Sequence, residues 1–215
     1  MAAGRTRLNR DFVASPGGVL LAAAGAVGAV ALWWRRNPSA CPYSQRFWVE
    51  APHPLITRSR LLEILDAKPG ERVLEIGPGT GYYTPELAEG VGSEGEVEIF
   101  DLQQEMLDHT IRRVRERGLW NVNATRGDAQ QLPQEDDAFD AAVLITVLGE
   151  IPDPEAALLE VARVLRSGGR LVVGELVGDP HYVTIATLRR RAEAAGLRFE
   201  HRSGPRAGYF ARFRA

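Results

Sequence analysis

From about residue 55 onward, short apolar runs alternate with longer amphipathic ones. The apolar runs predict strands at residues 72–77, 96–101, 121–128, 139–147 and 168–176. The amphipathic runs predict helices that start near residue 82, cover 102–118, extend from Pro154 to a stop at Gly168–Gly169, and cover 183–196. Residues 197–215 predict two closing strands in an antiparallel hairpin, because RSGPRAG between them supplies turn residues. This alternation predicts an α/β fold with a doubly wound, mostly parallel sheet of seven strands.

The run before this body, residues 12–34, carries no charged side chain. Twenty-three residues can cross a hydrocarbon core of about 30 Å at about 1.5 Å per residue. Trp33–Arg36 supplies an aromatic and basic edge that suits a membrane interface. Residues 1–36 are therefore predicted as a hydrophobic helix and membrane anchor. The Ala and Gly content, and Arg on both flanks, keep a soluble helix packed on the body or on a partner as the alternative.

The remaining chain divides into a predicted linker and approach or lid segment at residues 37–54 and a body at 55–215. Cys41 is the single cysteine, which excludes an intrachain disulfide framework. The four histidines are scattered without ligand spacing, so no metal site is expected. Nucleic acid is not an expected partner, because the body is net acidic and lacks a basic stripe interleaved with aromatic residues.

Candidate chemistry begins at the end of the first predicted strand, in the segment Glu75-Ile-Gly-Pro-Gly-Thr-Gly81. Glycines there let the backbone approach a ligand, and the following helix start presents unpaired N–H groups. Asp101 ends the second strand, where a carboxylate can accept hydrogen bonds from both hydroxyls of a ribose. Asp128 ends the third strand, where it can accept from the amino group of adenine. Together they predict a nucleoside site, although alone Asp101 could cap a helix and Asp128 could be a turn residue.

Several longer motifs follow the same strand ends: VLEIGPGTG, the acid of IFDLQQEML, GDAQQLP, FDAAVLITVLGEIPD and EVARVLRSGGRLVV. With them, residues 55–215 resemble the class I S-adenosylmethionine-dependent methyltransferases, and the central motifs look most like the ubiquinone/menaquinone-type C-methyltransferases. The resemblance implies a Rossmann-like seven-stranded sheet with a C-terminal antiparallel hairpin, and S-adenosyl-L-methionine as the cofactor.

The resemblance also implies a set of cofactor-binding residues, carried over one by one: Glu75, Gly77, Gly79, Gly81, Asp101, Leu102, Met106, Asp128, Ala129 and Thr146. In this set the glycine loop surrounds the methionine part of the cofactor and Asp101 holds the ribose. Asp128 reads the adenine amino group, Leu102 and Met106 lie against the ring, and Thr146 lies beside the sulfonium.

A sulfonium methyl group is already activated, so its transfer needs mainly positioning and desolvation. A general base is needed only if the acceptor must lose a proton. Glu150, Asp153 and His181 follow strands four and five, where a base would have to lie. Glu150 and His181 are the candidates for this role, and a surface or capping role is the alternative for each.

The expected activity is methyl transfer to a small acceptor that is hydrophobic, lipid-like or membrane-associated. Carbon, oxygen, nitrogen and sulfur all stay open as the acceptor atom. The body is expected on the cytoplasmic side of a membrane, because S-adenosylmethionine is made and kept inside cells. The alternatives are a soluble cytoplasmic enzyme with a soluble acceptor, and a non-catalytic cofactor-binding membrane protein. An NAD-dependent oxidoreductase is disfavoured, because Tyr82 stands where G-x-G-x-x-G requires its third glycine.

Overall fold

The computed structural model describes Val19, residues 37–50 and residues 53–215. The chain divides into two units, Met1–Asn37 and Pro38–Ala215, and the second is described here. Apart from Val19, the hydrophobic helix predicted at residues 1–36 lies outside the described residues. Among those that the structure does describe, no helix is both long and apolar enough to cross a membrane.

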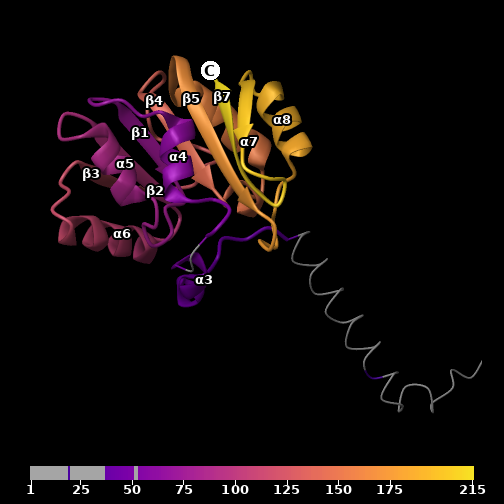
Figure 1. Cartoon of the computed structure of the whole chain (residues 1–215), viewed down its shortest axis with the longest axis horizontal. Helices are drawn as coiled ribbons and strands as arrows, with labels where there is room; N and C mark the ends of the chain where they lie inside the picture. Colours follow the sequence, from indigo (N-terminus) through magenta and orange to yellow (C-terminus); the bar gives the residue numbers. More distant parts are fainter. Residues whose placement is uncertain (1–18, 20–36, 51–52) are drawn as a thin grey trace, which may run out of the picture. The chain divides into compact units, whose positions relative to one another are not determined.

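The second unit is built around a mixed sheet with helices on both faces (Figure 1). Its strands are β1 (Arg72–Ile76), β2 (Glu96–Asp101), β3 (Val122–Arg126), β4 (Phe139–Ile145), β5 (Leu165–Leu176), β6 (Arg198–Ser203) and β7 (Gly208–Arg214). Its α-helices are α3 (Phe47–Glu50), α4 (Arg58–Leu65), α5 (Thr84–Val91), α6 (Gln104–Glu116), α7 (Pro154–Val164) and α8 (Ile185–Ala194). Short 3₁₀ turns lie at η1 (Tyr43–Gln45) and η2 (Leu148–Glu150).

The strand order is β3-β2-β1-β4-β5-β7-β6, with β1 to β5 parallel and β7 antiparallel to both neighbours. This confirms the predicted seven-stranded sheet and its C-terminal hairpin. The central strand β4 is buried at nearly every position, as expected for a parallel strand covered on both faces. Buried side chains of α4, α5 and α6 form the core on one face, and those of α7 and α8 form it on the other.

Several predicted helix boundaries differ from the structure, and two of these differences have a clear physical cause. Helix α7 ends at Val164 and β5 begins at Leu165, so the Gly168–Gly169 pair lies inside a strand. The Gly168 N–H donates to the Ala215 carbonyl at 3.0 Å, and the Ala215 N–H donates to the Gly169 carbonyl at 3.0 Å. Pairing with the distant C-terminus therefore replaces the expected last helical turn.

The second difference is that α6 begins at Gln104, so Leu102 precedes the helix and is 48% exposed. The Asp101 carboxylate accepts the Gln103 N–H at 2.8 Å, which holds residues 101–103 in a turn. A local hydrogen bond of this kind competes with helix formation.

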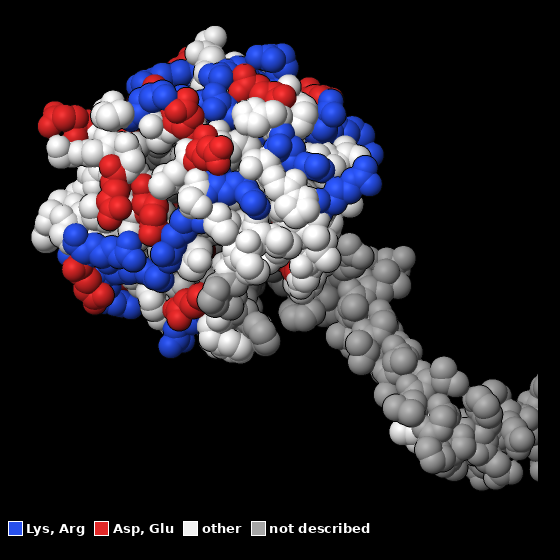
Figure 2. Space-filling model, viewed as in Figure 1, with Lys and Arg blue, Asp and Glu red and all other residues white. Residues whose placement is uncertain are grey.

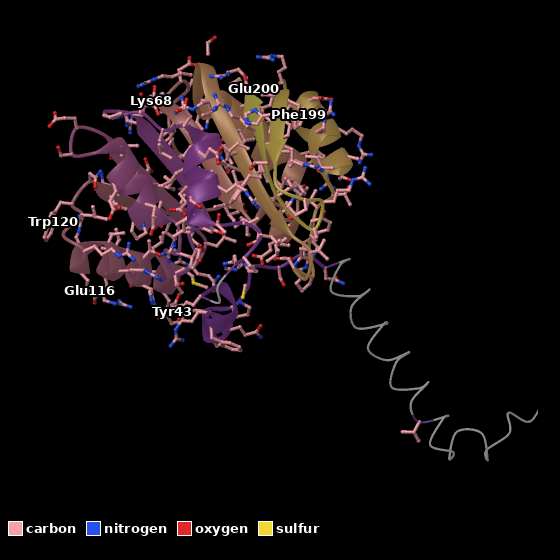
Figure 3. The ribbon with its side chains drawn as sticks, in the orientation of Figure 1. Tyr43, Lys68, Glu116, Trp120, Phe199 and Glu200 are labelled. Atoms are coloured by element: carbon pink, nitrogen blue, oxygen red, sulfur yellow. The ribbon has the colours of Figure 1, made fainter. Side chains whose placement is uncertain are left out.

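Charge is unevenly spread over the surface of the second unit. Charged side chains crowd the upper part of Figure 2, at the amino end of β5 and the carboxyl end of β7. A largely uncharged strip lies at the lower right, toward the carboxyl end of β5 and the amino end of β7. Val177, which directly follows β5, is 55% exposed. In Figure 3, Lys68 labels the side of the sheet at which the parallel strands begin, and Tyr43 labels the side at which they end.

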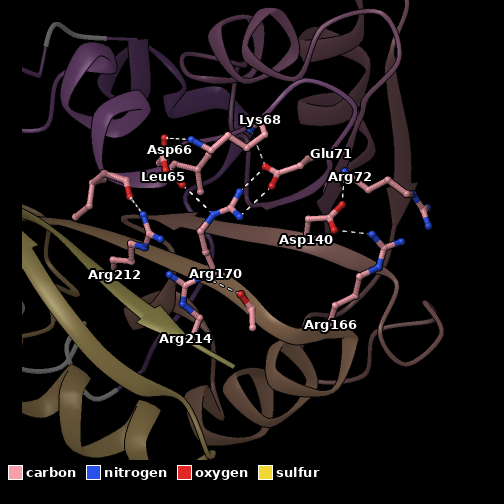
Figure 4. Close-up of polar contacts among 12 residues, drawn as sticks. Leu65, Asp66, Lys68, Glu71, Arg72, Asp140, Arg166, Arg170, Arg212 and Arg214 are labelled. Atoms are coloured by element: carbon pink, nitrogen blue, oxygen red, sulfur yellow. Dashed lines mark hydrogen bonds and ion pairs between the residues drawn. The ribbon is translucent and has the colours of Figure 1, made fainter.

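At the amino ends of the parallel strands, Arg170 of β5 forms a nearly buried ion pair with Glu71, which directly precedes β1 (Figure 4). The Arg170 Nη1 donates to Glu71 Oε1 at 3.0 Å, Nη2 contacts Oε2, and Nε donates to the Leu65 carbonyl at 2.9 Å. The guanidinium thus links α4, β1 and β5. A bidentate pair of this kind fixes geometry as well as charge.

We expect Glu71→Gln to lower the free energy of unfolding by about 2–3 kcal/mol, because it leaves the Arg170 cation buried without its counter-ion. Urea denaturation of the full chain measures the change. The matched control is Glu94→Gln, which alters an exposed loop carboxylate. Equal effects of the two variants would contradict the structural role of the pair.

Candidate active site

A cavity of about 110 Å³ lies at the carboxyl ends of the parallel strands. Its wall is formed by Ala40–Cys41, Ile76–Gly77, Phe100–Gln103, Met106, Gly127–Ala129, Ile145–Val147 and Glu150–Pro152. This is smaller than the roughly 300–1,000 Å³ of typical ligand pockets. Part of the wall comes from the linker, so residues 40 and 41 narrow the cavity.

The glycine loop after β1 depends on backbone conformations that favour glycine. Gly77, Gly79 and Gly81 have φ values of +68°, +58° and +73°. A Cβ on Gly77 would lie 2.3 Å from a Val147 methyl carbon, and one on Gly81 would lie 2.8 Å from the Thr110 methyl carbon. Gly77 lines the cavity, whereas Gly79 and Gly81 do not and instead shape the turn into α5.

Glu75 lies behind this loop and does not line the cavity. Its side chain is buried, and its Oε2 accepts a hydrogen bond of 2.6 Å from the Thr84 hydroxyl. Burial raises the pKa of the Glu75 carboxyl to about 7. Its predicted place beside the methionine part of a cofactor stays a prediction.

Asp101 ends β2 and lines the cavity. Burial raises the pKa of its carboxyl to about 6, although the hydrogen bond from the Gln103 N–H opposes this shift. It is not the N-cap of α6, since Gln103 occupies that position. A partly desolvated carboxylate at this place fits the predicted hydrogen bonds to ribose hydroxyls.

Asp128 and Ala129, which follow β3, and Met106 of α6 line the same cavity. Asp128 is exposed, and both of its oxygens accept from the Gln130 side-chain amide at 2.9 and 2.8 Å. Asp128 therefore stabilises the turn after β3 and also lines the cavity. The Asp128 carboxylate keeps acceptor capacity for a further donor, such as an adenine amino group.

Thr146 follows β4 and lines the cavity in the left-handed region, with φ +54°. Its N–H donates to the Gly174 carbonyl at 2.8 Å and its hydroxyl donates to the Ile145 carbonyl at 2.8 Å. A non-glycine residue in this conformation costs roughly 1–3 kcal/mol, and such residues cluster at functional sites.

Of the candidate bases, Glu150 reaches the cavity. Its Oε2 accepts the Cys41 N–H at 3.2 Å, and burial, followed by the charge of Asp179, raises the pKa of the carboxyl to about 8. His181 lies outside the cavity wall, and its backbone N–H donates to Asp179 Oδ1 at 2.6 Å. Asp153 caps α7 by accepting the Ala156 N–H at 2.9 Å.

Cys41 and Gln103 are not among the site residues predicted from the sequence, yet both lie in the cavity wall. The Gln103 side chain accepts the Tyr43 N–H at 3.0 Å and donates to the Cys41 carbonyl at 2.9 Å. Tyr43 also joins its hydroxyl to His109 Nδ1 at 3.1 Å. The signal for Gln103 is its position two residues after Asp101, whereas nothing in the local sequence marks Cys41.

The charged residues of the cavity wall are Asp101, Asp128 and Glu150, and no Lys or Arg lines it among the described residues. This arrangement suits a ligand with a positive charge, such as a sulfonium. Within residues 37–50 and 53–215, no group of three or more His, Cys, Asp or Glu is placed to hold a metal ion.

The Glu75 carboxyl gives a prediction for stability. Because its folded-state pKa of about 7 lies above the ordinary 4.5, the folded state binds the proton more tightly. The free energy of unfolding therefore falls as the pH rises through this window. Glu75→Gln cannot ionise, so we expect it to be more stable than the wild type by about 3 kcal/mol near pH 8.5, but not near pH 4. Urea denaturation at both pH values tests this.

The matched control for this measurement is Glu89→Gln, on the exposed side of α5. A difference between the Glu75→Gln variant and the wild type that is the same at both pH values would refute the assignment.

Comparison with known proteins identifies the family. Residues 53–185 match the model of the ubiE/COQ5 methyltransferase family. A protein of Streptomyces fradiae, the uncharacterized 37.1 kDa protein in transposon TN4556, is 43% identical over 118 residues, which are 55% of this chain and 34% of that protein. The ubiquinone/menaquinone biosynthesis C-methyltransferase UbiE of Vibrio campbellii is 38% identical over 110 residues, or 51% of this chain and 42% of that enzyme. The matched part of the chain thus spans less than half of either relative.

Two solved structures share the fold. A SAM-dependent methyltransferase from Aquifex aeolicus superposes with a TM-score of 0.74 at 23% identity, over 81% of this chain and 98% of that one. The [4+2]-cyclase SpnF superposes with a TM-score of 0.63 at 28% identity, over 68% of this chain and 57% of that one. The acidic cavity and its glycine loop fit S-adenosylmethionine as the cofactor. The chain belongs to the ubiE/COQ5 methyltransferase family and has the fold of the class I S-adenosylmethionine-dependent methyltransferases.

Proposed function

We propose that this chain transfers a methyl group to a small, uncharged and largely hydrophobic acceptor, with Glu150 as the general base. The observation that carries the proposal is that the Glu150 carboxyl and the Asp101 carboxyl line one cavity. One acid would serve the cofactor and the other would face the acceptor. A base with a pKa near the working pH is the most effective in proton transfer, and that of Glu150 is about 8.

We propose that S-adenosylmethionine binds in this cavity and contacts the residues of its wall. Asp101 would accept from the ribose hydroxyls, Met106 and Ala129 would pack against adenine, and Asp128 would accept from its amino group. Bound there, S-adenosylmethionine supplies an activated methyl group on a sulfonium. Thr146 and Gly77 come from the ends of β4 and β1, between the two acids, and would position the reacting centre.

The nature of the acceptor is inferred from what surrounds Glu150. Ile145, Val147 and Ile151 contribute apolar wall, and no cation stands among the described wall residues to pair with a carboxylate or phosphate. An acceptor without negative charge is therefore favoured. The names of similar proteins, which are ubiquinone/menaquinone biosynthesis C-methyltransferases, support an acceptor of the quinone class.

We further propose that residues 12–34 hold the chain at a membrane, with residues 38–215 on the cytoplasmic side. The uncharged run itself supports this. A second support is the largely uncharged strip toward the carboxyl end of β5 and the amino end of β7 (Figure 2). Val177, which directly follows β5, is exposed. The division into residues 1–36, 37–54 and 55–215 belongs to this proposal.

Cofactor binding is tested with Asp101→Asn. We expect the variant to bind S-adenosylhomocysteine about 10–100-fold more weakly than the wild type at pH 8, because two charge-assisted hydrogen bonds become neutral ones. Isothermal calorimetry measures the affinity. Asp108→Asn, an exposed acid on α6, is the control and should bind normally. Unchanged binding by Asp101→Asn would remove Asp101 from the site.

The acceptor is tested with cofactor that carries a labelled methyl group, incubated with the enzyme and either membranes or a soluble metabolite extract. We expect label in the lipid fraction, and at least a tenfold smaller yield with Glu150→Gln, because the acceptor proton then has no base. Glu155→Gln, which changes an exposed acid on α7, should behave as the wild type.

Two results of the labelling experiment would contradict the proposal. Label in the soluble pool alone would exclude a membrane acceptor. If the cofactor binds and neither fraction takes up label, methyl transfer itself is in doubt, and a reaction such as the cyclisation of the similar [4+2]-cyclase SpnF becomes the better candidate.

A further inference from the structure

We propose that Asp179 and Glu175 are positioning residues that act behind Glu150, forming a carboxyl relay that stores the proton taken from the acceptor. The inference rests on the proposed function, since it needs Glu150 to be the base. In the sequence these residues lie in three places: η2 after β4, the loop after β5, and the penultimate position of β5.

In the folded chain, these three segments lie next to one another. A Cβ on Gly149 would lie only 1.9 Å from the His181 carbonyl oxygen, so the turn that carries Glu150 packs directly on the loop 179–183. That loop is in turn tied to Glu175, whose Oε2 accepts the Val183 N–H at 3.0 Å. Asp179 lies within it and accepts the His181 N–H at 2.6 Å. One loop therefore joins the base to the other two acids.

Glu175 is the most unusual member of the relay. Its side chain is only 1% exposed, and its Oε1 finds no hydrogen-bond partner among the described residues. Tyr209, opposite it on β7, donates its hydroxyl to the Val183 carbonyl at 2.7 Å instead. A buried oxygen without a partner destabilises the fold. A proton on Glu175 would relieve that cost, which suits a group that receives one.

The three acids also influence one another electrostatically. Burial is the main reason that the pKa values of Glu150 and Glu175 each rise to about 8 and that the pKa of Asp179 rises. The charge of Asp179 raises the pKa of both glutamates further. The titratable groups that face the relay are Cys41 from the linker, Asp101 from β2, His181 and Tyr182 from the loop, and Tyr209 from β7.

The chemistry balances in atoms and charge. The acceptor X–H gives its proton to Glu150, the X–CH₃ bond forms and the S–CH₃ bond breaks, leaving a neutral thioether. The cavity loses the sulfonium charge as Glu150 becomes a neutral acid, so its net charge does not change. The proton then passes to Asp179 or Glu175 and leaves to water when the products depart. The acceptor class this implies carries a removable proton on oxygen, nitrogen or an activated carbon.

The relay can be tested without knowing the acceptor, because S-adenosylmethionine and S-adenosylhomocysteine differ by one positive charge. A cation in the cavity lowers the pKa of nearby carboxyl groups. Binding of the methionine compound near pH 7.5 should therefore release more protons than binding of the homocysteine compound. Calorimetry of the full chain in buffers of different ionisation enthalpy counts these protons.

We expect the difference in released protons to vanish in Glu150→Gln. In Asp179→Asn it should fall at least twofold, with its pH midpoint about one unit lower, because the negative charge of Asp179 then no longer raises the pKa of Glu150. Glu193→Gln, an exposed acid on α8, should match the wild type. If neither compound binds, the cofactor site itself is wrong. If both bind and release equal numbers of protons in the wild type, the relay is wrong while the cofactor site stands.

A second measurement uses the wild type alone, so it tests the relay even if the variants do not fold. With ¹³C-labelled Asp and Glu carboxyl groups, nuclear magnetic resonance should show at least two carboxyls that titrate above pH 7 and influence each other. If fewer than two carboxyls titrate above pH 7, or if those that do titrate independently of each other, the relay is overturned.

Discussion

The structure depends on the parallel pairing of β1 with both β2 and β4. Ile76 is in register with Phe100 on one side and with Leu144 on the other. The residues that follow these positions therefore leave the sheet at one level, which is why glycine loop, Asp101 and the turn after β4 share a cavity. The segment after β3 also packs closely against β2, because a Cβ on Gly127 would lie 2.5 Å from the Phe100 ring. A shift of one residue in either pairing would turn these side chains to the other face.

The same burial that builds the sheet also sets its electrostatics. Glu75, Asp101, Glu150 and Glu175 all have raised pKa values, and in each case burial is the largest cause. Two of these acids, Asp101 and Glu150, line the cavity, and no cation stands beside them among the described wall residues. Withdrawing carboxylates from water destabilises the protein without a ligand. A cationic cofactor would reverse part of this cost, so an unfavourable feature of the fold becomes a source of affinity.

What the sequence predicts well is what local pattern determines. Asp101 and Asp128 follow apolar runs directly, so their positions at strand ends could be inferred from residue order alone. The end of α7 could not, because Gly168 and Gly169 pair with Ala215, more than forty residues away. The role of Cys41 in the cavity wall rests on a contact with Glu150 over 109 residues of sequence. Neither the end of α7 nor the place of Cys41 can be predicted from the ten or twenty residues around it.

The linker shows how such a distant contact can matter for chemistry. Cys41 and Tyr43 are held by Gln103, next to the acid proposed for the ribose, and Cys41 also donates to Oε2 of Glu150. An acceptor that reaches this oxygen competes with the Cys41 N–H for it. Residues 40 and 41 form part of the wall of the cavity of about 110 Å³, so a larger ligand could also press against them. One short segment therefore touches both the cofactor side and the acceptor side of the cavity, and its displacement would free the proposed base at the moment that the site fills.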